Sequence, residues 1–494
     1  MERNLRYAAL GVLAAAILAI VKVQFLTPTL WEADGYYHIR VADLIRTTGP
    51  LKSFHWARYS FFADRFADKD FLYHVLLVPF TMVQDLVLGG KLAACFTAAL
   101  FIIVFWLVLK KYSHPALVPL FLAALLLSDH FLYALSRPRS MVAAMALMVL
   151  GIHFLIRRKL PWIFALAFLY GLEHITAPLM VFFAVAIELV RHFEDGPEGG
   201  FSWRPVAASA GGLLAGILLH PNFPNNILFT KLNLFLVPYY AAKGGVLELG
   251  AEFFPISTRD LLLGYPLLFP AILFMIAALM VRPVKAGFPA KAFFVCSAPF
   301  FLGMFLSQRY AVHGYPLYLL WMWAHFSAWD REDVRGMGRA ARLLALGGLG
   351  AAVLAAGFLT AGQIRRRALM ESFVNGHYER VAGWFRRNVP PGEVIFHANW
   401  SDSQYFIGLN PQNDYFVTLD PIYMYAWDPG LYQLYRDAAH GRTADPYQIL
   451  KDVFRVRYGY AGKNFFGNLI AQVRADPRFQ VMAEDPLGVI FKLK

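Results

Sequence analysis

Long apolar runs separated by short polar segments dominate the chain. A helix needs about 20 apolar residues to cross a bilayer, and the pattern predicts about eleven spans on this basis. They lie at about 7–27, 91–109, 116–134, 140–156, 161–175, 176–190, 205–220, 260–281, 289–306, 312–329 and 341–362. The pair at 161–190 is short and could instead form one long tilted helix. Segment 71–88 mixes apolar and polar residues, which predicts an amphipathic helix in the membrane interface.

The pattern changes after residue 362. A helical stretch runs to about Asn388, and five short apolar runs follow at 394–396, 415–419, 454–459, 479–483 and 488–493. Helix-like stretches at 430–440, 446–453 and 465–474 separate several of them, and this alternation is typical of a small α/β domain. We therefore expect a polytopic α-helical membrane domain at 1–362, with a first external loop at about 28–90, and a soluble α/β domain at 363–494.

Composition supports a membrane location. The chain has 494 residues, of which 58% are hydrophobic and only 16% are charged, against about 25% charged in soluble proteins. Its net charge of +13 comes largely from short loops that the spans place in the cytoplasm. This predicts a multi-pass protein of the cytoplasmic (inner) membrane, with a cytoplasmic N-terminus and an external or periplasmic C-terminal domain.

No basic face with interleaved aromatics stands free of the membrane, so nucleic-acid binding is not expected. Cys95 and Cys296 lie in apolar runs, which excludes a disulfide framework.

A polar cluster follows the first apolar run directly, at residues 31–40. Ionisable groups at a membrane edge are costly and usually mark a functional site. Asp34 could act as a general base on an acceptor hydroxyl or amide. Alternatively, it could be an interfacial carboxylate paired with Arg40. The predicted pocket around it includes Tyr36, Tyr37, His38 and Arg40, although the two tyrosines equally fit an interfacial aromatic belt.

The same loop holds further candidates. His55, Arg58 and His74 are predicted to complete the pocket. Asp68 and Asp70 form a D-x-D pair that could bind Mg²⁺ or Mn²⁺ together with phosphate oxygens. The alternative is a capped helix start, because aspartate suits a helix N-terminus.

Arginines in two later loops are candidates for phosphate recognition. Arg137 and Arg139 lie in a predicted external turn, and Arg309 and His313 fall one helical turn apart. Guanidinium groups bind phosphate oxygens in a bidentate manner. We predict that these four residues hold a donor phosphate, although contact with lipid headgroups would also explain the first pair.

Two more clusters complete the predicted site. Glu173 and His174 lie between two short apolar runs, where they are costly unless used or paired. Trp400 and Asp402 belong to a polar and aromatic segment at 399–405 that is suited to sugar contact. The loops of an α/β domain have the same character without any ligand.

These motifs resemble those of C-type (GT-C) glycosyltransferases that use polyprenyl-linked sugar donors, and most of all those of oligosaccharyltransferase catalytic subunits. Asp34, Tyr36 and Arg40 stand in an Asp-x-Tyr-x-x-x-Arg pattern. Ser136 and Arg137 match the start of that family's second external loop. Arg309 matches a donor-binding arginine, and Trp400-Ser401-Asp402 is similar to part of a Trp-Trp-Asp motif.

The resemblance implies an inverting membrane glycosyltransferase. It would move a sugar or glycan from a polyprenyl (di)phosphate carrier to a protein, glycan or lipid acceptor on the external face. Asp34 would be its catalytic residue and Arg309 a contact of the donor phosphate. Arg139, Ser140 and Met141 stand where oligosaccharyltransferases carry acidic metal ligands, which leaves metal use open. A lipid-linked glycan flippase and a non-catalytic glycan-assembly subunit are the alternatives.

Overall fold

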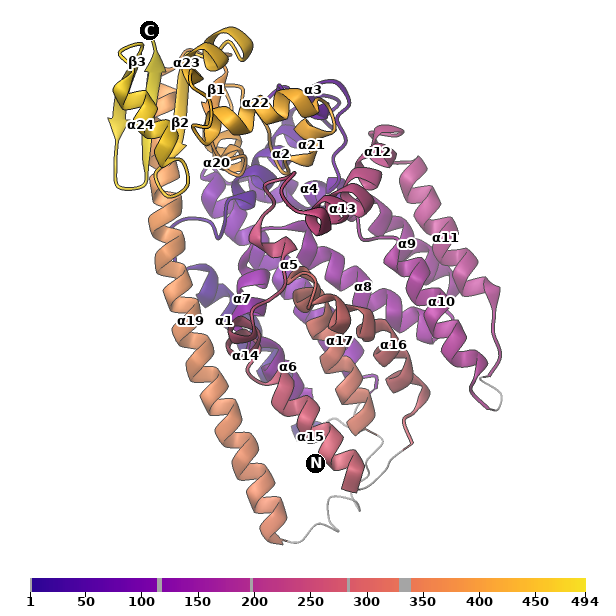
Figure 1. Ribbon diagram of the computed structural model, residues 1–494. Coiled ribbons are helices and arrows are strands. Elements are labelled where there is room, and N and C mark those ends of the chain that lie inside the picture. Colours follow the sequence, from indigo (N-terminus) through magenta and orange to yellow (C-terminus); the bar gives the residue numbers. More distant parts are fainter. Residues whose placement is uncertain (1, 113–117, 196–198, 282–284, 328–338) are drawn as a thin grey trace. The chain divides into compact units, whose positions relative to one another are not determined.

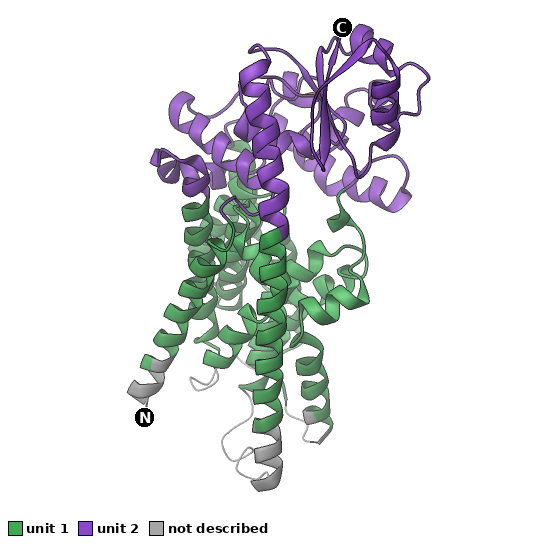
Figure 2. Ribbon diagram, turned by 90° about the vertical axis from the view of Figure 1, so that its left-hand side faces the viewer, with its two compact units in different colours: residues 1–27, 91–219, 250–369 green, residues 28–90, 220–249, 370–494 purple. Residues whose placement is uncertain are grey.

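The computed structural model describes residues 2–112, 118–195, 199–281, 285–327 and 339–494, and it is built mainly of helices with one small sheet (Figure 1). The chain forms two compact units, each assembled from separate stretches of sequence (Figure 2). Unit 1 comprises residues 1–27, 91–219 and 250–369. Unit 2 comprises residues 28–90, 220–249 and 370–494. The predicted domain limit at residue 362 stays a prediction.

Unit 1 is an assembly of apolar helices. They are α1 (Glu2–Gln24), α5 (Leu86–Leu109), α6 (Val118–Leu126), α7 (Asp129–Ser136), α8 (Ser140–Ile156), α9 (Leu160–Glu173), α10 (Leu179–His192), α11 (Trp203–Leu218), α14 (Thr258–Gly264), α15 (Leu268–Val281), α16 (Phe288–Gly303), α17 (Arg309–Phe326) and α19 (Arg339–Asn388). Helix α9 packs against α8 and α11, and α16 packs against α10 and α17. The first residues of α5 and the last part of α19 belong to unit 2.

Most predicted spans coincide with helices. Helix α8 has the predicted bounds, and α9 and α10 are separate helices, so the single long helix considered for 161–190 is wrong. Within the described residues, only α5 and the Gly347–Asn388 part of α19 are individually long and apolar enough to cross a membrane. Two bent pairs would raise this number to four. The predicted count of about eleven spans therefore stays a prediction.

Two predicted spans are not straight, which corrects the sequence analysis. Helices α6 and α7 meet at 77°, and α14 and α15 meet at 82°. At the first bend, Ser128 caps α7 by accepting a hydrogen bond from the Phe131 amide at 3.1 Å. Its hydroxyl also donates to the Gly264 carbonyl, at the second bend, at 2.5 Å. Pro266 lies in the second break, and proline cannot supply a helical amide hydrogen bond.

The C-terminal part of unit 2 contains a four-stranded sheet. Its strands are β1 (Ile395–His397), β2 (Tyr458–Gly462), β3 (Phe479–Glu484) and β4 (Gly488–Leu493), in the order β1-β2-β4-β3. β1 is parallel to β2, and the other two pairs are antiparallel. The helices around it are α20 (Asp402–Leu409), α21 (Ile422–Tyr425), α22 (Pro429–Ala439), α23 (Pro446–Gln448) and α24 (Gly467–Ala475). The predicted soluble α/β segment is thus confirmed as an α/β structure.

One predicted strand is absent. The run at 415–419 is buried, but within the described chain it forms only an isolated bridge between Tyr415 and Ala57. Leu419 ends the extended stretch with a φ of 65°, a left-handed conformation that interrupts a strand.

The other segments of unit 2 are short helices. They are α2 (Asp34–Thr48), α3 (Phe61–Asp64), α4 (Phe71–Leu77), α12 (Asn225–Lys231) and α13 (Val237–Lys243). The predicted amphipathic helix at 71–88 is α4 followed by a 3-10 turn at Val78–Met82, and Leu86 already begins α5. Pro79 explains this early end, because its ring disfavours a continuing α-helix.

Candidate functional site

Asp34 is the first residue of α2, and its side chain is partly exposed. The positive end of a helix dipole favours a carboxylate in this position. The next five residues, from Gly35 to Ile39 with Tyr36, Tyr37 and His38 between them, are buried. The local sequence therefore anchors α2 through its aromatic face and leaves Asp34 at the accessible end of the helix.

A polar stripe on α19 holds the segment that carries Asp34. Glu371, Asn375 and Glu379 are spaced four residues apart, so they share one face of the helix. The contacts are Glu32 N to Glu371 Oε2 at 3.2 Å, Asn375 Nδ2 to the Leu30 carbonyl at 2.6 Å, and Tyr36 Oη to Glu379 Oε1 at 3.0 Å. This stripe was not predicted from the sequence, although its four-residue spacing within a predicted helix could have indicated it.

Helix α20 lies against α2 beside Tyr36. A Cβ on Gly408 would come within 2.6 Å of the Tyr36 carbonyl oxygen, so only glycine fits. Arg40 donates to the Gly408 carbonyl and forms an ion pair with Asp43 at 3.0 Å. Arg40 therefore pairs with Asp43, and its alternative pairing with Asp34 stays a prediction.

Three buried side chains form a hydrogen-bonded chain one helical turn after Asp34. His38 Nδ1 lies 2.8 Å from His74 Nε2, and His74 Nδ1 lies 2.7 Å from Asp68 Oδ2. All three residues are at most 4% exposed. Because a carboxylate only accepts, His74 donates to Asp68 through Nδ1. The structure thus brings together three predicted site residues.

The carboxylates of the D-x-D pair have protein partners. Besides His74, Asp68 accepts a hydrogen bond from the Asp70 amide at 3.1 Å. Asp70 pairs with Lys69 at 2.7 Å. Among the described residues, no group of three or more His, Cys, Asp or Glu side chains is placed to hold a metal ion. This arrangement does not fit a divalent cation, and dependence on Mg²⁺ or Mn²⁺ stays a prediction.

The remaining candidate residues of the first loop contact other side chains of unit 2. Tyr37 is buried and makes edge contacts with the rings of Phe54 and His74. His55 and Arg58 both approach the Asp414 carboxylate, at 2.8 and 3.8 Å. Their predicted substrate contacts stay predictions.

Two predicted phosphate-binding arginines converge on one carboxylate in unit 1. Arg309 forms a hydrogen-bonded ion pair with Glu252 Oε1, and Arg139 Nη1 lies 3.5 Å from Glu252 Oε2. The Arg309 guanidinium also lies over the Phe253 ring, with 3.8 Å to the centroid. Residues 139 and 309 are far apart in sequence, and the structure brings them together at the Glu252 carboxylate, a cluster that we call the anion centre. Glu252 was not among the site residues predicted from the sequence.

Electrostatics of this centre favour an anion. Burial by itself would raise the pKa of the Glu252 carboxyl, but the charges of Arg309, Arg139 and Arg137 lower it below its usual range. Arg137 thus contributes to the same field, and its guanidinium lies 4.9 Å from the Tyr133 ring. His313 follows one turn after Arg309, and its Nδ1 bonds the Arg309 carbonyl at 2.9 Å. The four residues predicted to hold a phosphate therefore lie around one region of unit 1.

Glu173 and His174 end helix α9. Glu173 is 1% exposed. The His174 ring caps the following turn through Thr176 Oγ1, at 2.7 Å. Their predicted place in a substrate pocket stays a prediction.

Asp402 lies in the interior of unit 2, while Trp400 is partly exposed. The Asp402 carboxyl is 1% exposed and accepts a hydrogen bond from the Tyr378 hydroxyl at 2.6 Å. Burial raises the pKa of the Asp402 carboxyl to about 7. These surroundings suit a structural carboxyl, and its predicted contact with substrate stays a prediction.

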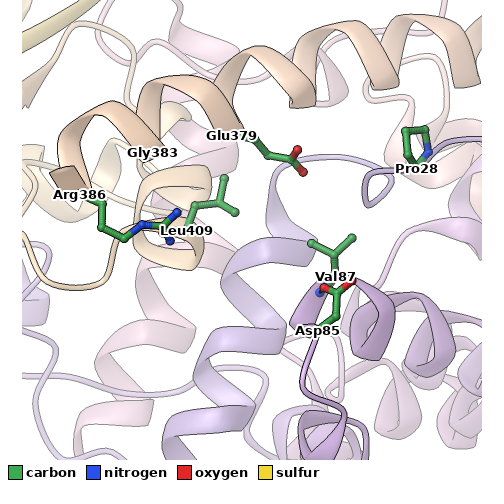
Figure 3. Close-up of a pocket in the computed structure, with 7 residues that line it drawn as sticks. All are labelled: Pro28, Asp85, Val87, Glu379, Gly383, Arg386 and Leu409. Atoms are coloured by element: carbon green, nitrogen blue, oxygen red, sulfur yellow. Dashed lines mark hydrogen bonds between the residues drawn. The ribbon is translucent and has the colours of Figure 1, made fainter.

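A cavity of about 370 Å³ opens in unit 2 next to Tyr36. Figure 3 shows its lining, in which the Glu379 carboxylate projects from α19 into the hollow and Asp85 stands on the other side. Its lining residues are Pro28, Asp85, Val87, Glu379, Gly383, Arg386 and Leu409. None of them was predicted from the sequence.

Comparison with solved structures identifies the fold. ArnT from Cupriavidus metallidurans, bound to undecaprenyl phosphate, matches with a TM-score of 0.63 and 12% identity, covering 98% of this chain and 97% of that one. The apo Archaeoglobus fulgidus oligosaccharyltransferase matches with a TM-score of 0.58 and 12% identity, covering 92% and 70%. The arabinofuranosyltransferase AftD from Mycobacteria matches with a TM-score of 0.54 and 15% identity, covering 97% and 40%. The chain has a GT-C-like fold.

The GT-C-like fold confirms the resemblance that the motifs suggested. Identities of 12–15% establish the fold alone. No protein-family model and no curated protein sequence matches the chain. Asp34 belongs to unit 2 and Arg309 to unit 1, so the expectation that they share a cavity stays a prediction.

Proposed function

We propose that this protein is a membrane glycosyltransferase that takes a sugar or glycan from a polyprenyl phosphate or diphosphate carrier. The observation that carries the proposal is the convergence of Arg139 and Arg309 on the Glu252 carboxylate. A pair of guanidinium groups that binds one carboxylate can bind a phosphate in the same way. The GT-C-like fold supports this assignment, because ArnT was solved with undecaprenyl phosphate and the archaeal enzyme AglB with dolichol phosphate.

In the proposed reaction, the Asp34 carboxylate takes the proton of an acceptor hydroxyl or amide. The acceptor atom then forms a bond to the anomeric carbon of the sugar. The bond between that carbon and the phosphate oxygen breaks, and the lipid phosphate leaves with the electron pair. Arg309 and Arg139 stabilise its charge, with help from Arg137. Direct attack of this kind inverts the anomeric configuration.

The proposed site of transfer is the external face of the cytoplasmic membrane. The basic residues of the short loops favour a cytoplasmic N-terminus and an external C-terminal domain. An acceptor that is a protein, a glycan or a lipid is compatible with this placement. No step of the proposed reaction passes through a metal ion.

A deletion strain tests this proposal in the native membrane. Loss of the transferase should cause a polyprenyl-linked sugar to accumulate in the outer leaflet, where mass spectrometry and externally added glycosidase detect it. Accumulation in the cytoplasmic leaflet would instead indicate a flippase and contradict the proposal. An unchanged lipid profile would contradict both activities.

A further inference from the structure

Three charged side chains surround the cavity of Figure 3, and none makes an ion pair within the described parts of the chain. Asp85 accepts a hydrogen bond from the Val87 amide at 2.9 Å, and Glu379 accepts one from Tyr36. Arg386 donates to the Leu409 carbonyl at 3.2 Å. Each of these groups retains unused hydrogen-bonding capacity that faces a hollow of about 370 Å³.

Gly383 lines the cavity between two of these groups and is itself buried. Glu379, Gly383 and Arg386 follow one face of α19 at spacings of four and three residues. A glycine inside a helix is less favourable than alanine. Packing does not require it here, because a Cβ on Gly383 would meet only the tip of the Arg387 side chain, at 3.4 Å. Close approach of a ligand to the helix backbone would explain why this position lacks a side chain.

We propose that this cavity binds a sugar unit of the acceptor, an inference that rests on the proposed glycosyl transfer. Sugar hydroxyls both donate and accept hydrogen bonds. The Asp85 and Glu379 carboxylates accept them, and the Arg386 guanidinium donates. Two carboxylates repel a phosphate, and three charged groups disfavour a lipid chain. The volume falls within the usual range for small-ligand pockets, about 300–1,000 Å³.

The cavity connects directly to the segment that carries the candidate base. The Glu379 carboxylate lines the hollow and also receives the Tyr36 hydroxyl at 3.0 Å. Tyr36 lies two residues after Asp34 in the same helix. A sugar that forms a hydrogen bond with Glu379 would therefore lie next to the Tyr36–Glu379 hydrogen bond, which positions this end of α2.

Gly383→Met tests the site, with Gly376→Met as its matched control. Methionine favours helix at both positions, but only residue 383 lines the cavity, and a Cβ on Gly376 would meet nothing nearer than Arg380 Nη1 at 3.8 Å. Binding of free cellobiose, lactose, maltose and chitobiose to the full chain in detergent is measured by saturation-transfer NMR. We expect at least one disaccharide to bind, Gly383→Met to weaken it about tenfold, and Gly376→Met to leave it unchanged.

Several results would overturn the proposal. It is overturned if none of the four sugars binds the wild type, or if Gly383→Met binds them normally. Should Gly383→Met fold poorly, Arg386→Ala replaces it, because Arg386 is exposed and its removal leaves the helix intact. Retained binding in Arg386→Ala then overturns the proposal. If Asp34→Asn loses glycosyl transfer and Gly383→Met still binds sugar normally, only the sugar-binding role of the cavity is rejected. If Asp34→Asn transfers sugar normally, the proposed function itself is rejected.

Discussion

The Tyr36 hydroxyl donates a hydrogen bond to the Glu379 carboxylate at 3.0 Å, across 343 positions of sequence. This contact is one of three by which the polar stripe on α19 holds the segment around Asp34. A base at the end of a helix needs such support, because general-base catalysis depends on hydrogen-bonding geometry.

Tyr36→Phe removes this hydrogen bond and keeps the ring. We expect the rate of glycosyl transfer to fall about tenfold, since small misplacements of a catalytic group reduce rate strongly. Affinity for the lipid donor should not change. Tyr458→Phe is the control, because the Tyr458 hydroxyl makes no hydrogen bond to the residues that the structure describes. Equal rates for Tyr36→Phe and the wild type would contradict the positioning role.

Arg309→Ala and Glu252→Gln should change donor affinity in opposite directions. Arg309→Ala removes a guanidinium from the anion centre, and we expect a loss of at least about tenfold in polyprenyl phosphate binding. Glu252→Gln removes the carboxylate that competes for both arginines, so binding should become tighter.

Scintillation proximity with labelled polyprenyl monophosphate measures these affinities in detergent. Arg259→Ala serves as the control, because Arg259 is exposed on α14 and forms no ion pair with any described residue. If Glu252→Gln binds the lipid less tightly, the carboxylate is part of the donor site and not its competitor.

Gly408→Ala should destabilise unit 2. The added methyl group would lie 2.6 Å from the Tyr36 carbonyl oxygen and Cβ, which forces α20 and α2 apart. We expect a loss of about 1–3 kcal/mol, as for other overpacked sites. Gly376→Ala, on an open face of α19, should be neutral or slightly stabilising. Thermal unfolding, followed by intrinsic fluorescence, measures the melting temperature of each variant. Equal melting temperatures would contradict the prediction, because they would show that α20 moves away from α2 at little cost in stability.

Asp402→Asn should stabilise the protein at pH 8 but not at pH 4. Burial raises the pKa of the Asp402 carboxyl to about 7, so the folded protein holds a proton there that the unfolded chain releases near pH 4. Wild-type stability therefore falls as pH rises from about 4 to about 7. Asparagine keeps an acceptor for the Tyr378 hydroxyl and does not ionise. The gain should reach roughly 1–4 kcal/mol at pH 8, and a pH-independent difference would contradict the raised pKa.

The sequence predicted the features that depend on local pattern. Apolar runs located nearly all the helices of unit 1, and the short runs at 394–396, 479–483 and 488–493 located three of the four strands. The Asp-x-Tyr-x-x-x-Arg pattern and the arginines predicted to bind phosphate indicated the GT-C-like fold before any comparison.

Features that depend on distant partners could not be predicted in this way. The bend at Ser128 requires the Gly264 carbonyl, and the role of Glu252 emerges only where Arg139 and Arg309 meet. The cavity beside Glu379 combines residues 28, 85, 87, 379, 383, 386 and 409. No local periodicity marks such a combination.

Asp34→Asn, compared with Asp43→Asn on the same helix, tests the central claim most directly. Asp43 pairs with Arg40 and Arg46 at the side of α2 and has no assigned chemistry. Each variant is expressed in the deletion strain, and the accumulated polyprenyl-linked sugar is measured by mass spectrometry. Loss of a general base should reduce transfer by about 10²–10⁴-fold, so the donor should accumulate with Asp34→Asn and not with Asp43→Asn. Normal donor turnover with Asp34→Asn would contradict the assignment of Asp34 as the catalytic base.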